Sequence, residues 1–91
     1  LKMLRCELKI INKLGLHARA ATKLASAAGH HQCSIRIGAP EQSVDAKSIM
    51  SLMLLAASQG TDLRFEFDGP DEQQAQKEIT QLLADYFGEG E

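Results

Sequence analysis

Apolar and polar residues alternate in three stretches of the chain, which is the pattern of a strand with one buried face and one solvated face. These stretches are residues 3–11, 33–37 and 62–68. A further, shorter strand is expected at residues 42–45, because the turn sequence "GAPE" before it favours a hairpin. The alternation predicts an antiparallel sheet that is covered on one face and exposed to water on the other.

Apolar residues at helical spacing mark the segment between the first two strands as a helix. The helix is expected to begin at His17 and to end at Gly29. Its apolar face consists of Ala21, Leu24, Ala25 and Ala28. The many alanines indicate that this helix packs closely on the sheet.

Two more helices are predicted further along the chain. The second covers residues 49–58, with Ser48 as its N-cap, and it is apolar on nearly all sides. The third begins around the sequence "DGPDE", where Asp68 or Asp71 can cap it, and continues to Tyr86.

The order of these elements is βαββαβα, which predicts an α+β open-faced β-sandwich: a four-stranded antiparallel sheet with three helices on one face. We expect residues 1–91 to form a single domain, with residues 1–2 as a cloning remnant. Residues 88–91, "GEGE", are expected to be a frayed tail. The predicted solvated acidic end consists of Asp85, Glu89 and Glu91.

Composition and charge then exclude several classes of function. The chain is 44% hydrophobic and 24% charged, with a formal net charge of -2, no tryptophan and no run of basic residues. Nucleic acid is therefore not an expected partner, because phosphate-backbone binding needs a concentrated basic face. The longest apolar run, "LMLLAA" at residues 52–57, is too short to span a membrane. No secretory signal opens the sequence, so we expect a cytoplasmic, monomeric protein that does not contact membranes.

The cysteines and the paired histidines carry no predicted chemistry. Cys6 and Cys33 lie on the apolar faces of their strands and are expected to be small buried hydrophobes, not a disulfide. His30 and His31 precede Cys33 in the sequence "HHQC", but the spaced pairs of a zinc site are missing. No "GxxxxGK" or "GxGxxG" motif occurs, so neither a metal nor a cofactor is expected.

His17 and Arg19 carry the predicted chemistry. Backbone N–H groups at a helix start lack acceptors and, together with the helix dipole, bind anions such as phosphate. The same field disfavours a charged imidazole, so we expect His17 to keep a free ring nitrogen that can act as a nucleophile. The planar guanidinium of Arg19, on the same turn, can bind phosphoryl oxygens. These residues predict a phosphohistidine site.

Two simpler interpretations of this helix start stay open at this point. A lone histidine at a helix start is often only a surface or capping residue. A small anion-binding domain would also use the free amides but would not need a nucleophile.

Three motifs make the interpretation more specific: "GLHARAA" at residues 15–21, "AKSIMSLMLLAASQGTDL" at residues 46–63 and "GPDEQQA" at residues 69–75. In this order and spacing they resemble the histidine-containing phosphocarrier family, HPr, of the bacterial phosphoenolpyruvate-dependent phosphotransferase system. The sequence "NKLGLHAR" favours the nitrogen-branch member of the family, NPr. The resemblance implies a phosphoryl carrier and not a stand-alone enzyme.

The resemblance also implies roles for individual residues. Phospho-enzyme I would phosphorylate His17 on Nδ1, and an enzyme IIA would take the phosphoryl group. Arg19 would stabilise that group, and the backbone N–H groups of Ala18 and Ala20 would line the anion site. The family usually has proline where Ala20 stands. Alanine there gives a looser helix start and one more N–H donor.

The apolar second helix is explained if it docks partners. Ile49, Met50, Met53 and Leu54 cannot all face the sheet, so we expect some of them to form an exposed docking surface. Ser48 corresponds to a regulatory phosphorylation site in some branches of the family. A phosphate there would place negative charge next to the docking surface. The alternative function is therefore a regulatory protein-binding module, which an HPr kinase/phosphorylase would control through Ser48.

Overall fold

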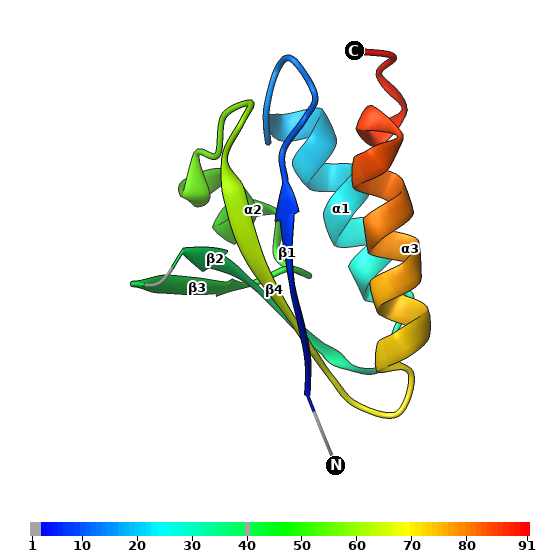
Figure 1. Ribbon diagram of the computed structural model, residues 1–91. Helices are drawn as coiled ribbons and strands as arrows, with labels where there is room; N and C mark the ends of the chain where they lie inside the picture. Colours follow the sequence, from blue (N-terminus) through cyan, green and yellow to red (C-terminus); the bar gives the residue numbers. More distant parts are fainter. Residues whose placement is uncertain (1–2, 40) are drawn as a thin grey trace.

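The predicted alternation of strands and helices is present in the computed structural model, which describes residues 3–39 and 41–91 (Figure 1). The elements are β1 (Leu4–Lys9), α1 (Ala18–Gly29), β2 (Ser34–Ala39), β3 (Gln42–Asp45), α2 (Ile49–Leu55), β4 (Asp62–Asp68), α3 (Glu72–Ala84) and the 3₁₀ turn η1 (Tyr86–Gly88). The residues that the prediction assigned to the cloning remnant, 1–2, lie outside the described ones.

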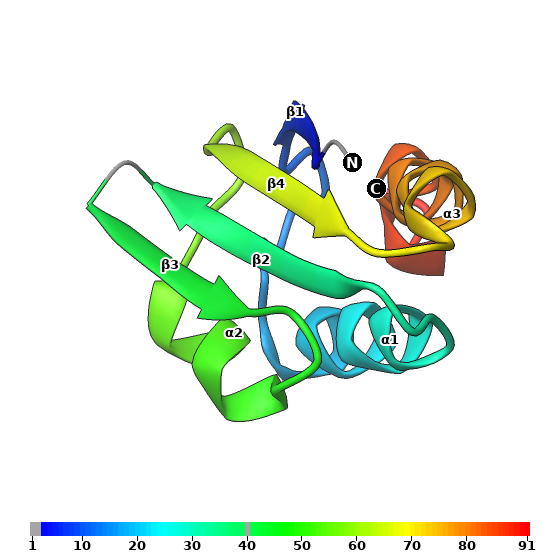
Figure 2. The same ribbon diagram turned by 90° about the horizontal axis from the view of Figure 1, so that it is seen from below.

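The strands form one antiparallel sheet in the order β1-β4-β2-β3. The central strand β4 pairs with both β1 and β2, so that Phe67 lies opposite Leu4 on one side and Ile35 on the other. The three α-helices cover the same face of this sheet (Figure 2). The predicted α+β open-faced sandwich is therefore confirmed.

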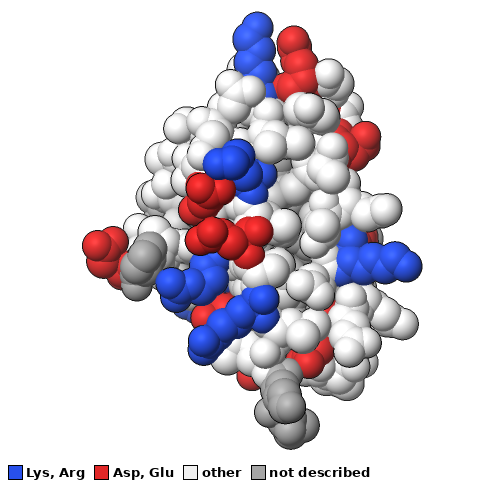
Figure 3. Space-filling model, viewed as in Figure 1, with Lys and Arg blue, Asp and Glu red and all other residues white. Residues whose placement is uncertain are grey.

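The covered face of the sheet contains the core. Phe65 and Phe67 are fully buried on β4, with their ring centroids 6.2 Å apart. The opposite face carries cross-strand ion pairs, Arg5 with Glu66 at 3.3 Å and Lys9 with Asp62 at 3.0 Å. Figure 3 shows basic and acidic side chains interleaved over the strands. The alternation along each strand thus separates an apolar face from a charged one.

The helices α2 and α3 are both shorter than the sequence predicted. The second helix ends at Leu55 and not at residue 58, because Ala56 adopts a left-handed conformation with φ 51°. This turn directs Ala57 into the core, where it is 7% exposed. The third helix ends at Ala84, and Tyr86 lies beyond it with its side chain 37% exposed. Tertiary contacts, and not local periodicity, set both ends.

The residues after α3 also differ from the prediction of a frayed tail. Phe87 is fully buried, and its carbonyl oxygen accepts a hydrogen bond of 2.8 Å from Lys23 Nζ. Further on, the carbonyl oxygen of Glu91 accepts a hydrogen bond of 2.6 Å from the backbone N–H of Lys13. We call residues 85–91 the tail segment. It is bound to α1 and to the loop after β1, so Figure 1 shows the end of the chain beside that loop.

We predict that Phe87→Ala destabilises the fold by about 3–5 kcal/mol, because it removes a fully buried ring from the core. The matched control is Tyr86→Ala, at a neighbouring position with the same left-handed backbone but a partly exposed ring. It should cost about 1 kcal/mol or less. Urea unfolding of both variants measures the difference. Equal losses would show that Phe87 does not anchor the tail segment.

Candidate functional site

The candidate site is built on the first turn of α1. His17 is the N-cap residue, with an extended backbone (φ -80°, ψ -177°), and its carbonyl oxygen accepts the N–H of Ala21 at 2.8 Å. The amides of Ala18, Arg19 and Ala20 precede that bond, so the helix offers them no acceptor. The side chain of His17 does not cap them either. A positive end of the helix with free donors therefore lies next to the imidazole.

A tight turn places His17 at this position. Gly15 has a positive φ of 71°, and a Cβ atom there would lie 2.7 Å from the carbonyl oxygen of Ala57. That same oxygen accepts the backbone N–H of Leu16 at 2.8 Å. Only glycine fits this approach, which ties the residue before His17 to the segment that follows α2.

A carboxylate from the tail segment holds the imidazole. Glu89 Oε2 lies 2.7 Å from His17 Nε2, and Glu89 Oε1 lies 3.0 Å from Asn12 Nδ2. The His17 side chain is 29% exposed and that of Glu89 only 8%. The prediction that Glu89 belongs to a solvated acidic end is therefore wrong. Its carboxylate is drawn into the site by two polar side chains from the other end of the chain.

Asn12 holds the Glu89 carboxylate in this contact by a second hydrogen bond. It is fully buried, and its Nδ2 also donates to the carbonyl oxygen of Gly15 at 2.8 Å. Both neighbours of Nδ2 are oxygen acceptors, so this orientation of the amide is the one that makes hydrogen bonds. Asn12 Oδ1 is buried without a partner among the described residues.

The surroundings of Glu89 favour its charged form. Burial alone would raise the pKa of its carboxyl group. The hydrogen bonds from Asn12 and His17, together with the positive charges of His17 and Arg19, outweigh burial and hold this pKa below its ordinary value. Glu89 is therefore a carboxylate at neutral pH.

Arg19 and Ala20 lie where the sequence places them, on the first turn of α1. Arg19 is exposed, and among the described residues no acidic group forms an ion pair with its guanidinium. Ala20 is fully buried and Ala18 is exposed. Arg19 can thus turn toward an anion at the helix start without breaking an ion pair.

An apolar surface lies on α2 and on the loop before α1. All four predicted docking residues are exposed, by 40% for Ile49, 75% for Met50, 46% for Met53 and 74% for Leu54. Leu14, which the sequence analysis did not single out, is 68% exposed in the loop that leads to His17. We call these five residues the apolar surface. Leu14 could have been noticed as a leucine within the polar turn sequence "NKLG".

Ser48 is the N-cap of α2, as predicted. Its Oγ accepts the backbone N–H of Ser51 at 3.2 Å, and its side chain is partly buried. The hydroxyl therefore has a structural partner, and Ser48 lies directly before Ile49, a residue of the apolar surface.

The paired histidines lie at the other end of α1 and contact carboxylates of α3. His31 Nε2 lies 2.6 Å from Glu78 Oε1, and His31 Nδ1 lies 3.3 Å from Asp71 Oδ2. Asp71 is the N-cap residue of α3, but its side chain accepts the amides of Gln32 and Cys33, both at 2.9 Å, and does not cap the helix. These contacts join the ends of α1 and α3.

Cys33 beside this cluster is buried, while Cys6 is half-buried, and both are free. Burial and the neighbouring Asp71 carboxylate raise the pKa of the Cys33 thiol to about 11. Cys33 therefore stays a protonated, apolar group. Among residues 3–39 and 41–91, no group of three or more His, Cys, Asp or Glu side chains is arranged to hold a metal ion.

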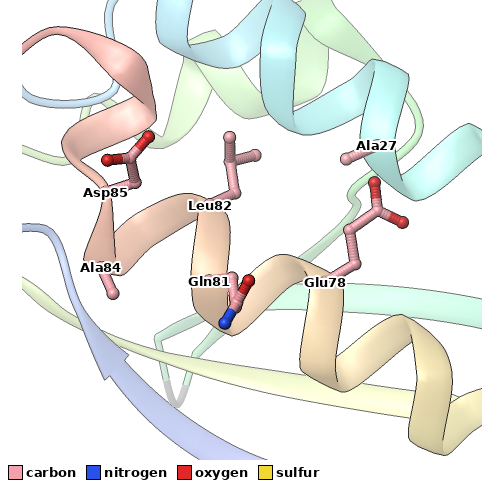
Figure 4. Close-up of a pocket in the computed structure, with 6 residues that line it drawn as sticks. All are labelled: Ala27, Glu78, Gln81, Leu82, Ala84 and Asp85. Carbon is pink, nitrogen blue, oxygen red and sulfur yellow. The ribbon is translucent and has the colours of Figure 1, made fainter.

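A groove lies between α1 and α3, away from His17. It is lined by Ala27, Glu78, Gln81, Leu82, Ala84 and Asp85 (Figure 4). Its lining includes neither His17 nor Arg19, so this groove does not coincide with the site described above. In the described part of the chain, no helix has the length and apolar character to cross a membrane.

Comparisons with known proteins decide the family. Residues 4–85 match the family model described as "PTS HPr component phosphorylation site". The chain belongs to the HPr family. It is 49% identical over 89 residues to the phosphocarrier protein HPr of Cupriavidus necator, covering 98% of this chain and 100% of that protein. HPr is a phosphocarrier of the phosphotransferase system, so the resemblance inferred from the sequence motifs is confirmed.

Solved HPr structures have the same fold. HPr-C-His from Thermoanaerobacter tengcongensis superposes with a TM-score of 0.90 at 36% identity, covering 94% of this chain and 97% of that one. A structure titled as an HPr dimer from the same organism has a TM-score of 0.76 at 38% identity, covering 90% and 94%. The expectation that this chain is a monomer stays a prediction.

We predict that the Glu89 carboxylate makes the stability of this protein depend on pH. A carboxyl group whose pKa is lower in the folded chain stabilises the fold above its ordinary pKa of about 4.3, and this contribution is lost as the pH falls through the folded value. Wild type should therefore be more stable than Glu89→Gln near neutral pH, and the gap should close in acid.

Urea unfolding at a series of pH values measures this gap. Glu91→Gln is the matched control, because it removes an exposed carboxylate from the same segment. A gap between wild type and Glu89→Gln that does not change with pH would contradict the assignment of Glu89 as a stabilising carboxylate.

Proposed function

We propose that His17 accepts a phosphoryl group from phospho-enzyme I and transfers it to an enzyme IIA of the phosphotransferase system. The observation that carries the proposal is the position of the imidazole as N-cap of α1, beside three amides that have no acceptor within the helix. Membership of the HPr family supports the same chemistry.

The transfer consists of two displacement reactions at phosphorus. In the first, the lone pair of His17 Nδ1 attacks phosphorus, and the bond between phosphorus and its carrier atom on enzyme I breaks. In the second, a nucleophile on enzyme IIA attacks phosphorus, and the electron pair of the P–N bond returns to Nδ1. Each step moves one phosphoryl group. After both steps the chain is in its original, unphosphorylated state.

The first turn of α1 stabilises the phosphoryl group in this proposal. The amides of Ala18 and Ala20 donate to its oxygens, and the positive end of the helix offsets its charge. Arg19 adds charge-assisted hydrogen bonds from its guanidinium. Ala20 contributes an N–H that the family's usual proline would lack.

The apolar surface is the proposed docking site for both partners. One of its residues, Leu14, lies three residues before His17 in the sequence. Exposed methionines such as Met50 and Met53 adapt to different partner surfaces, which suits a carrier that meets enzyme I and enzyme IIA in turn. We place these encounters in the cytoplasm.

Regulation through Ser48 is a second candidate role. Its hydroxyl precedes the apolar surface, so a phosphate added by an HPr kinase/phosphorylase would bring negative charge to the edge of the docking site. The hydrogen bond that Ser48 accepts from Ser51 explains the residue without regulation. Regulation through phosphorylation of Ser48 stays a prediction. The branch of the phosphotransferase system in which the protein acts, sugar or nitrogen, also stays a prediction.

We predict that enzyme I and radiolabelled phosphoenolpyruvate label wild type and do not label His17→Ala. The label should be lost in acid and kept in base, as expected of a phosphoramidate. His31→Ala is the matched control and should be labelled like wild type. Absence of label on wild type, or label that survives His17→Ala, would overturn the proposal.

We predict that Arg19→Glu slows phosphoryl transfer at least about tenfold, because it replaces a guanidinium at the phosphoryl site by a repelling carboxylate. Arg64→Glu makes the same change of charge on the exposed face of the sheet and should keep the wild-type rate. Rapid-quench measurements with phospho-enzyme I give both rates. An unchanged rate in Arg19→Glu would remove Arg19 from the site.

A further inference from the structure

Glu89 determines which nitrogen of His17 carries the proton. A carboxylate only accepts hydrogen bonds, so its contact of 2.7 Å with Nε2 requires the ring proton to be on Nε2. The lowered pKa of Glu89 is consistent with this charged acceptor. The lone pair of the neutral ring then lies on Nδ1. The His17 side chain does not cap the helix, so this lone pair does not accept a hydrogen bond from the first helical amides.

Asn12 fixes the carboxylate that makes this contact. Its Nδ2 donates to Glu89 Oε1 at 3.0 Å and to Gly15 at 2.8 Å, so it links the carboxylate to the turn before His17. Both carboxylate oxygens are thereby engaged by side chains of the site.

The tail segment carries Glu89 into the site at a conformational cost. Tyr86 and Phe87 both have positive φ values, 57° and 54°, which residues other than glycine rarely adopt. Burial of Phe87 and the hydrogen bond from Lys23 to its carbonyl oxygen hold this turn. The strained turn directs the next residues of the chain back toward α1.

We propose that Glu89 is a positioning residue for phosphoryl transfer: it holds His17 in the Nε2–H tautomer and stabilises the positive charge that the ring gains when Nδ1 bonds to phosphorus. This inference rests on the proposed function of His17. The same arrangement of a carboxylate behind an imidazole orients the histidine in serine hydrolases.

The proton stays on Nε2 throughout both steps. When Nδ1 attacks, the N–P bond forms, the donor's bond to phosphorus breaks, and the ring becomes an imidazolium beside the Glu89 carboxylate. When the phosphoryl group leaves, the electron pair of the N–P bond returns to Nδ1 and the ring is neutral again. Glu89 neither gains nor loses a proton, so it acts only through its charge and its hydrogen bond.

The charged groups around the ring have opposing effects. Glu89 from the tail segment lies on the Nε2 side and favours the imidazolium, whereas the positive end of α1 and Arg19 favour the phosphoryl group. Because the carboxylate contacts Nε2, Nδ1 stays available to phosphorus while the anion binds at the helix start.

The test compares Glu89→Gln with Glu91→Gln. An amide at position 89 can donate to Nε2 and so favours the proton on Nδ1, while the change at Glu91 alters only an exposed carboxylate of the same segment. Long-range ¹H–¹⁵N NMR of the His17 ring, at a pH where the ring is neutral, reports the tautomer without any phosphoryl donor. Thermal unfolding verifies that both variants are folded.

We expect the Nε2–H tautomer in wild type and Glu91→Gln, and loss of its dominance in Glu89→Gln. We also expect phosphorylation by phospho-enzyme I to be at least about tenfold slower in Glu89→Gln and unchanged in Glu91→Gln. An unchanged tautomer, or an altered tautomer with an unchanged rate, would overturn the proposal. A slow rate with the wild-type tautomer would overturn the claim that Glu89 selects the tautomer, because loss of its charge would then explain the slower transfer.

Failure of the proposed function looks different. Wild type would then take no label from phospho-enzyme I, and the role of Glu89 in transfer would fall with it. The NMR comparison would still show whether Glu89 selects the tautomer, so the two failures are distinguishable.

Discussion

The burial of the alanine-rich face of α1 in the core is the constraint on which the site depends. Ala20, Ala21 and Ala28 are fully buried, and the helix has its close contacts with α2, α3 and η1. A helix held this closely has little freedom to tilt, and its first turn is fixed relative to the loop that precedes it. The free amides, the imidazole of His17 and the guanidinium of Arg19 therefore share one place on the surface.

The two ends of α1 have different roles: the C-terminal end is joined to α3, and the N-terminal end carries the candidate site. At the far end, His31 bridges carboxylates of α3, and the amides of Gln32 and Cys33 bind Asp71. These polar groups satisfy one another and join the helices. At the near end the helix amides have no helical acceptor. The same type of side chain, histidine, is thus part of a closed network at one end and of an open site at the other.

The parts of the fold that depend on local pattern could be predicted from the sequence. The alternation in β4 predicted its bounds, the N-cap position of Ser48 was predicted, and the start of α1 was predicted to within one residue of Ala18. Helix ends that depend on distant contacts could not be predicted. Ala56 leaves the helical conformation where the chain turns to bury Ala57, and no residue type there marks the turn.

The polar partner Glu89 of His17 could not be predicted either, because the contact depends on residues that are far apart in the sequence. Glu89 is 72 residues away along the chain, within a sequence of glycine and glutamate that is typical of a solvated end. Its position follows from the burial of Phe87 and the turn at Tyr86. Only the three-dimensional structure relates these residues to the imidazole.

The most direct test of the account is to follow the backbone amides when the protein is phosphorylated. In ¹H–¹⁵N spectra, enzyme I and phosphoenolpyruvate should produce the largest shifts at Ala18, Arg19 and Ala20, because their N–H groups would bind the phosphoryl oxygens. The amides of Gln32 and Cys33, which are bound to Asp71, should change little. Largest shifts at those two residues or at the start of α2, with the first turn of α1 unchanged, would contradict a phosphoryl site at His17.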